Sequence, residues 1–143
     1  MEKINKYFLK VLLFILLSTN VLAENKILKI GSNDAKISIK VFSSLTCPHC
    51  ANFHMNIFEN LKKDYIDKGL VKFEHHSFPL DLAALNAEII IRCHNDNIGR
   101  FQLLGEIYKK QSQWAVGSDI KVINESIKNI GLNSGLSKNK MNK

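Results

Sequence analysis

Two cysteines stand at the junction between a predicted strand and a predicted helix, which restricts the fold of this chain more than any other feature. Residues 36–43 alternate apolar and polar side chains, which predicts a β-strand. From Cys50 onward apolar residues recur every four positions, which predicts an amphipathic helix of about four turns that Gly69 ends. Cys47 and Cys50 therefore lie where the strand gives way to the helix.

The segment Cys47-Pro48-His49-Cys50 has several features that favour disulfide chemistry. A thiolate is the attacking species in disulfide exchange, and the free N–H groups and positive dipole end of a helix N-terminus stabilise one at Cys47. Pro48 suits the first helical position, because its missing N–H costs nothing there. His49 adds a hydrogen-bond donor, or a positive charge when protonated, near the same sulfur. Cys50 is near enough to form a disulfide with Cys47, and we expect it to be less exposed.

Two further strands are predicted on either side of this unit. A short apolar stretch at 27–30 ends in turn residues, and the alternating residues of 70–78 stop at Pro79. A strand–helix–strand unit of this length implies a right-handed crossover between parallel strands. The predicted fold class is therefore α/β.

The second half of the chain is predicted to be helical. Asp81 is placed to cap a helix over 82–94, and Ser118 is placed to cap a later helix that Gly131 would end. Another helix is expected between them, after a break at 97–99. The apolar face of the first helix is expected to be buried, and it carries Leu82, Leu85, Ile89 and Cys93.

The N-terminal residues have the pattern of a secretory signal peptide. A basic head precedes an apolar run at 11–17, and Val21-Leu22-Ala23 offers small residues for cleavage, so residues 1–23 would be removed. An uncleaved membrane anchor is the alternative, but the apolar run is far shorter than the about 20 residues that a spanning helix needs. Residues 24–132 would form one domain, followed by a polar tail at 133–143 that is expected to fray.

The charge and the third cysteine add two further expectations. The formal net charge of +7 is scattered along the chain and comes almost entirely from lysine. Phosphate recognition favours clustered cations and usually arginine, so nucleic-acid binding is not expected. Export would place the chain in an oxidising compartment, where Cys93 is expected to be a small buried apolar residue rather than a resolving thiol.

The segment around the cysteines resembles a known family. Ser43-Ser44-Leu45-Thr46-Cys47-Pro48-His49-Cys50-Ala51-Asn52-Phe53-His54 is similar to the active-site segment of the DsbA-like branch of the thioredoxin superfamily, in which Pro-His is the typical dipeptide between the cysteines. Phe78-Pro79-Leu80-Asp81 resembles the end of that family's next core strand. The resemblance covers roughly 37–131 and implies a thioredoxin-like fold with a helical insertion at about 80–131. No residues match the family's later strand, cis-proline loop, second strand and terminal helix.

This resemblance implies an exported thiol-disulfide oxidoreductase of the periplasm, which promotes disulfide bond formation in other exported proteins. Cys47 would form the mixed disulfide, Cys50 would be its partner, and Pro48 and His49 would complete the site. Protein thiols would be the substrates, and a membrane or soluble redox partner would reset the disulfide. The resemblance implies no metal or organic cofactor.

Two alternatives remain open. The first is an exported metal-binding or thiol-carrier protein, in which the cysteine pair is half of a zinc site. Its other ligands would come from a small set, namely Cys93, His94, His54, His75 and His76. The second is an inactive truncated remnant, because no strand pattern follows Gly131. Of the remaining residues, His54 is expected to face solvent and Trp114 to be a packing anchor.

Overall fold

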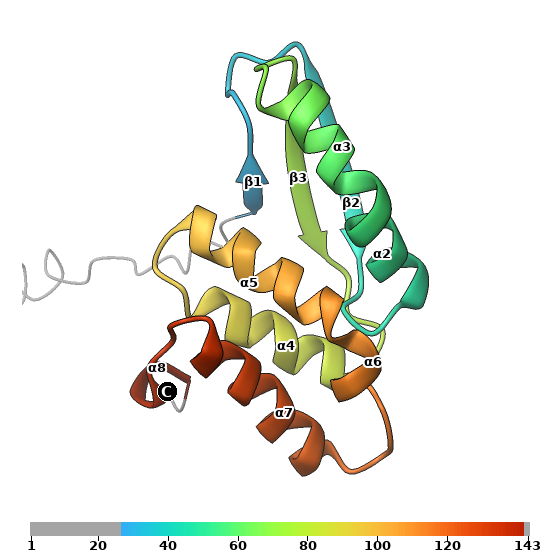
Figure 1. The fold of residues 1–143 in the computed structure, drawn as a ribbon, viewed down its shortest axis with the longest axis vertical. Coiled ribbons are helices and arrows are strands. Elements are labelled where there is room, and N and C mark those ends of the chain that lie inside the picture. Colours follow the sequence, from blue (N-terminus) through green and yellow to red (C-terminus); the bar gives the residue numbers. More distant parts are fainter. Residues whose placement is uncertain (1–26, 142–143) are drawn as a thin grey trace, which may run out of the picture.

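The computed structural model describes residues 27–141, so the predicted signal peptide at 1–23 lies outside the described residues and stays a prediction. Three strands form one sheet with the order β1-β3-β2, and their bounds are β1 (Leu28–Ile30), β2 (Ile37–Ser43) and β3 (Val71–Ser77). β2 is parallel to β3, and β1 is antiparallel to it. All three predicted strands are confirmed, and within residues 27–141 β2 is an edge strand (Figure 1).

A long helical segment connects the two parallel strands. It consists of α2 (Pro48–Phe53), η1 (His54–Phe58), α3 (Glu59–Leu61) and η2 (Lys62–Ile66), where η1 and η2 are wider π-helical turns. The predicted amphipathic helix is therefore confirmed, although it starts at Pro48 and is not a regular α-helix throughout. Gly69 follows it with a positive φ of 73°, a conformation that glycine adopts without strain.

Helices make up the second half of the chain, as predicted. They are α4 (Leu82–Arg92), α5 (Asn97–Lys109), α6 (Gln111–Trp114), α7 (Ile120–Asn133) and α8 (Lys138–Met141). We call α4 to α7 the helical insert; it lies below the sheet and the 48–66 helix in Figure 1, and α5 contacts both β1 and η1. Trp114 is the expected packing anchor, because it is buried and its indole N–H donates to the Ile107 carbonyl at 2.8 Å. Over the described residues, no helix is long and apolar enough to cross a membrane.

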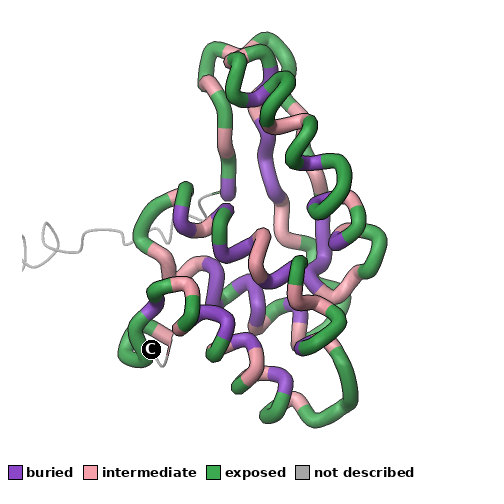
Figure 2. The backbone as a smooth tube through the Cα atoms, in the orientation of Figure 1, coloured by how far each residue is buried: buried purple, intermediate pink, exposed green. Residues whose placement is uncertain are grey.

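Aromatic rings join the sheet to the 48–66 helix and to the helical insert. The ring of Phe58, from η1, lies 4.8 Å from that of Phe73 on β3 and 6.0 Å from that of Phe101 on α5. All three side chains are buried, and the buried positions in Figure 2 run from the sheet through the middle of the helical insert. One continuous core therefore fixes the position of the insert relative to the sheet.

The predicted buried face of α4 is wrong. Leu82, Leu85 and Ile89 are 57%, 43% and 52% exposed, and Cys93 at the C-terminal end is only half-buried. The helix instead buries the face that carries Ala84, Ala87, Glu88, Ile90 and Ile91. Small alanines let neighbouring elements approach closely, and Glu88 finds a buried partner on β3.

Of three predictions about where helices begin, one is confirmed. Asp81 caps α4 as expected, since its carboxylate accepts from the Ala84 N–H at 2.7 Å. The predicted break at 97–99 is wrong, because α5 starts at Asn97 and is capped by Asp96. Ser118 is also wrong as a cap, because Asp119 accepts from the Lys121 N–H at 2.9 Å. In both cases an adjacent aspartate is the N-cap, and its negative charge also suits the helix dipole.

The end of α7 also differs from the prediction. Gly131 lies inside the helix, and Gly135 is the terminating glycine, with φ of 89°. The Leu136 N–H donates to the Gly131 carbonyl, and the Gly135 N–H donates to the Leu132 carbonyl, both at 3.0 Å. Leu136 is buried and α8 follows it, so the expected frayed tail is ordered through residue 141. The apolar contact of Leu136 therefore holds the C-terminal residues against the core.

Candidate active site

Cys47 occupies the N-cap position of α2. Its backbone is extended, with φ of −78° and ψ of 120°, and Pro48 follows at the first helical position as predicted. The Cys47 carbonyl accepts the first helical hydrogen bond, from the Ala51 N–H at 3.1 Å. Cys50 lies one turn further into α2, and both sulfurs are free thiols in this structure. The structure therefore places Cys47 where helix N–H groups can reach its sulfur.

The two thiols have opposite electrostatic environments. A hydrogen bond from the backbone of Cys50 is the main cause of a lowered pKa at Cys47, and the Cys50 thiol and the His49 backbone act in the same direction. Burial raises the pKa of Cys50, and the neighbouring Cys47 raises it further. The pair thus contains one thiol that favours the thiolate and one that favours the protonated form, which is the asymmetry predicted from the sequence.

His49 and Cys93 differ in their relation to the cysteine pair. The His49 side chain is exposed, and the effect of this residue on Cys47 comes through its backbone. Cys93 lies at the end of α4 that points away from α2 (Figure 1). Its thiol donates to the carbonyls of Ile89 and Lys140 at 3.4 and 3.3 Å, so it is held under α8 rather than beside the pair.

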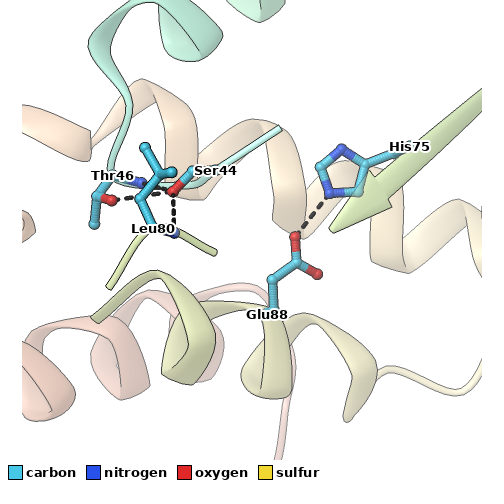
Figure 3. Close-up of polar contacts among 5 residues, drawn as sticks. All are labelled: Ser44, Thr46, His75, Leu80 and Glu88. Carbon is cyan, nitrogen blue, oxygen red and sulfur yellow. Dashed lines mark hydrogen bonds and ion pairs between the residues drawn. The ribbon is translucent and has the colours of Figure 1, made fainter. Parts of the chain in front are cut away.

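The loop before Cys47 is hydrogen-bonded to the start of the helical insert. The Ser44 hydroxyl accepts from the backbone N–H groups of Thr46 at 3.4 Å and Leu80 at 3.3 Å (Figure 3). The Thr46 hydroxyl donates to the second carboxylate oxygen of Asp81 at 2.7 Å. Asp81 therefore both caps α4 and fixes the loop that carries the cysteines.

A second contact with the insert comes from Gln111, the first residue of α6. Its side-chain amide donates to the Leu45 carbonyl at 2.8 Å and to the Cys47 carbonyl at 3.0 Å. Sequence reasoning missed Gln111, because a glutamine in a polar stretch carries no signal of what its side chain will meet 64 residues away.

Polar and aromatic side chains are buried on the inner side of this site. His54 is 7% exposed, so the prediction that it faces solvent is wrong. Its ring lies 4.7 Å from that of Phe58 and 5.0 Å from that of Tyr108, and burial lowers its pKa to about 4. His54 shares a helix face with the buried residues Ala51 and Phe58, and Tyr108 of α5 covers this face, so the ring lies in the interior.

Tyr108 connects this buried region to the cysteines. Its hydroxyl is buried without a regular hydrogen bond within the described structure. Burial raises its pKa, and the negative charge of a thiolate at Cys50 or Cys47 would raise it further, whereas the nearby Ser43 hydroxyl lowers it. Tyr108 thus lies within electrostatic range of both sulfurs.

The histidines considered as metal ligands are engaged elsewhere. His75 contacts Glu88 at 2.7 Å, His76 contacts Glu74 at 3.1 Å, and His94 contacts Asp96 at 3.3 Å. Among residues 27–141, no group of three or more histidine, cysteine or acidic side chains could hold a metal ion. The ligand set considered from the sequence is not assembled in this part of the chain.

The fold and the cysteine position together define a class of protein, a thioredoxin-like α/β fold of the DsbA type with a helical insert after the second parallel strand. A family model described as thioredoxin matches residues 23–143, and the chain belongs to this family. The predicted fold class is thereby confirmed.

Known proteins agree with this assignment. The structure is similar to the crystal structure of α-DsbA1 of Wolbachia pipientis, with a TM-score of 0.74 and 26% identity, over 82% of this chain and 58% of that one. A Rickettsia bellii protein, provisionally named a protein-disulfide oxidoreductase, is 35% identical over 103 residues, which is 71% of this chain and 39% of the relative. Disulfide bond formation protein D of Bacillus subtilis is 33% identical over 87 residues, 57% of this chain and 38% of the relative. The chain thus spans about two fifths of the length of the curated relatives it matches.

Proposed function

We propose that this protein catalyses thiol-disulfide exchange through Cys47 and Cys50. One observation carries the proposal. Cys47 lies at a helix N-terminus that lowers its pKa, while burial raises the pKa of Cys50 one turn away. In such a pair, the sulfur with the low pKa accepts a transient bond to another molecule, and the second sulfur resolves that bond. The names of the Rickettsia and Bacillus relatives support this activity.

The steps of the exchange follow from the lowered pKa of Cys47 and the raised pKa of Cys50. In the oxidising direction, a substrate thiolate attacks Cys47 of the Cys47–Cys50 disulfide, and Cys50 leaves as a thiolate that takes up a proton. A second substrate thiolate then attacks the substrate sulfur of the mixed disulfide, and Cys47 leaves as a stabilised thiolate. The substrate is oxidised by two electrons and the enzyme pair is reduced. The low pKa of Cys47 makes it a good leaving group, which favours this direction.

Exported proteins with free thiols are the proposed substrates. Phe78 and Leu80 are 59% and 64% exposed and lie in the segment that hydrogen-bonds to the cysteine loop. Exposed apolar side chains next to the loop that leads into Cys47 suit a polypeptide substrate that has not yet folded. The signal-peptide pattern of residues 1–23 supports export to the periplasm, and a membrane or soluble redox partner would reoxidise the cysteines.

Titration of the thiolate ultraviolet absorbance tests the activity of the site. In the Cys93→Ser protein, one thiol should titrate below the ordinary range and one above it, and Cys47→Ser should remove only the low transition. Cys50→Ser serves as the matched control, because the Cys50 backbone hydrogen bond, the main cause of the low pKa of Cys47, remains and the low transition should persist. The protein should also reoxidise a reduced, unfolded substrate. An ordinary titration of Cys47 together with no substrate oxidation would contradict the proposal.

Export requires its own test. Expression of the full chain with a C-terminal tag should yield a periplasmic product whose N-terminus follows Ala23, as read by N-terminal sequencing. A change of Leu13 and Leu16 to Lys breaks the apolar run and should leave the product uncleaved in the cytoplasm. Recovery of an uncleaved product from the unaltered chain would overturn the export proposal.

A further inference from the structure

The helical insert contacts the backbone of the reactive cysteine directly. Gln111 donates one amide hydrogen bond to the Leu45 carbonyl at 2.8 Å and one to the Cys47 carbonyl at 3.0 Å. Leu45 is fully buried, so the first of these bonds fixes the amide against a part of the loop that is packed into the core. The second bond then reaches the residue that carries the chemistry.

The Cys47 carbonyl has both of its acceptor positions filled. One is used by the Ala51 N–H at 3.1 Å, which closes the first turn of α2, and the other is used by Gln111. A carbonyl oxygen has two lone pairs, so these bonds together define the direction in which it points. The side chain and the carbonyl group of Cys47 are attached to the same Cα atom. Fixing the direction of the carbonyl therefore also limits where the sulfur lies relative to the helix N-terminus.

We propose that Gln111 is a positioning residue for Cys47: its side-chain amide holds the Cys47 peptide so that the sulfur stays at the N-terminus of α2. This inference rests on the proposed function, since it concerns the reactivity of the same thiol. Gln111 contacts neither the sulfur nor a substrate, and it acts through the backbone. The helical insert thereby contributes to the reactivity of a cysteine that lies outside it.

Three alternative roles give different results. A purely structural Gln111 would change the melting temperature without changing the titration of Cys47. If Gln111 acted only through general electrostatics, the titration of Cys47 would change when a charge is introduced at position 111 but not when the hydrogen-bond donor alone is lost. A positioning role predicts that loss of the two hydrogen bonds weakens the contact between the sulfur and the N–H groups, which raises the pKa of Cys47 and slows its reaction at neutral pH.

The test uses Gln111→Met, which keeps the side-chain length and removes the donor, with Gln113→Met as the matched control. Gln113 is in the same short helix and is exposed. In Gln111→Met, the rate of Cys47 alkylation by iodoacetamide near neutral pH should fall about threefold to tenfold, as expected for lost hydrogen bonds, and the thiolate transition should move to higher pH. Gln113→Met should match the wild type. An unchanged alkylation rate and transition in a folded Gln111→Met protein would overturn the inference.

Two further measurements remain informative if that variant does not fold. Gln111→Glu also lacks the donor and should raise the Cys47 transition, and an unchanged transition in a folded Gln111→Glu protein would refute the positioning role. In the wild-type protein, the side-chain amide protons of Gln111 should exchange with solvent more slowly than those of Gln113, and equal rates would refute it as well. A wild-type Cys47 with an ordinary titration would instead contradict the proposed function, which keeps the two failures distinct.

Discussion

The imidazole of His75 and the carboxylate of Glu88 meet in the interior of the protein, with Nε2 and Oε1 2.7 Å apart (Figure 3). Their side chains are 3% and 5% exposed. His75 belongs to β3, the central strand, and Glu88 to α4, so this contact connects the sheet to the helical insert. A buried charged or polar group without its partner is costly, so each residue depends on the other.

Replacing Glu88 alone should therefore strongly destabilise the protein. We expect Glu88→Leu to lower the free energy of unfolding by about 3 to 5 kcal/mol, because it leaves the His75 imidazole buried without its acceptor. The double change His75→Leu with Glu88→Leu should recover much of this loss, since an apolar pair replaces a polar one. Urea unfolding of both variants measures the difference, with Glu125→Leu on the exposed part of α7 as a control within about 0.5 kcal/mol. Equal losses in the single and double variants would contradict a direct pair.

The orientation of α4 can be tested with two isoleucines of the same helix. Ile91 is 1% exposed and Ile89 is 52% exposed. Ile91→Ala should lower the free energy of unfolding by about 2 to 5 kcal/mol, because it leaves a cavity in the core. Ile89→Ala should change it by no more than about 1 kcal/mol, since this side chain already contacts water. The opposite ranking in chemical denaturation would show that α4 buries the face predicted from the sequence.

His54 should make the folded protein sensitive to acid. Its pKa is lowered from 6.5 to about 4 by burial, so the unfolded chain binds a proton at this residue at a higher pH than the folded protein does. The resulting loss of stability begins as the pH falls below the unfolded value and reaches about 2 to 3 kcal/mol near the folded one. His54→Phe keeps a stacked ring and should lose less stability between about pH 7.5 and about pH 4.5 than the wild type. Parallel pH dependences of the two proteins would refute this role.

Gly135 should be difficult to replace. Its φ of 89° lies in the left-handed region, where a side chain is strained, although nothing within 4 Å would obstruct a Cβ atom. Gly135→Ala should cost about 1 kcal/mol through the backbone alone, and Gly135→Asn should cost less because asparagine tolerates this conformation better. The melting temperatures of the two variants give the ranking. A Gly135→Ala protein as stable as the wild type would mean that α7 does not end in this way.

The sequence predicted the elements that depend on local pattern. The alternation in 36–43 and 70–78 located β2 and β3, and the capping residue Asp81 located the start of α4. The asymmetric cysteine pair could also be predicted, because its environment is set by the first turn of the helix that follows. These features need only the residues within a few positions of one another.

The errors arose where a residue's partner lies far away in the chain. Both faces of α4 are apolar, and only the packing of α5 and α7 against it shows that the face with the alanines is the buried one. No sequence pattern marks Glu88 as buried, because its partner, His75, is on another element. His54 was misplaced because Tyr108, which covers it, lies on α5. Gln111 was missed because its acceptors are the Leu45 and Cys47 carbonyls.

The carboxylate of Asp81 makes the cysteine loop and the first turn of α4 depend on each other. One oxygen accepts from the Ala84 N–H and the other accepts from the Thr46 hydroxyl, both at 2.7 Å. A movement of the loop that withdraws Thr46 therefore acts on the same group that protects the Ala84 amide. Deuterium uptake at that single amide would thus follow the opening of the loop next to Cys47, and it can be observed without a label near the sulfur.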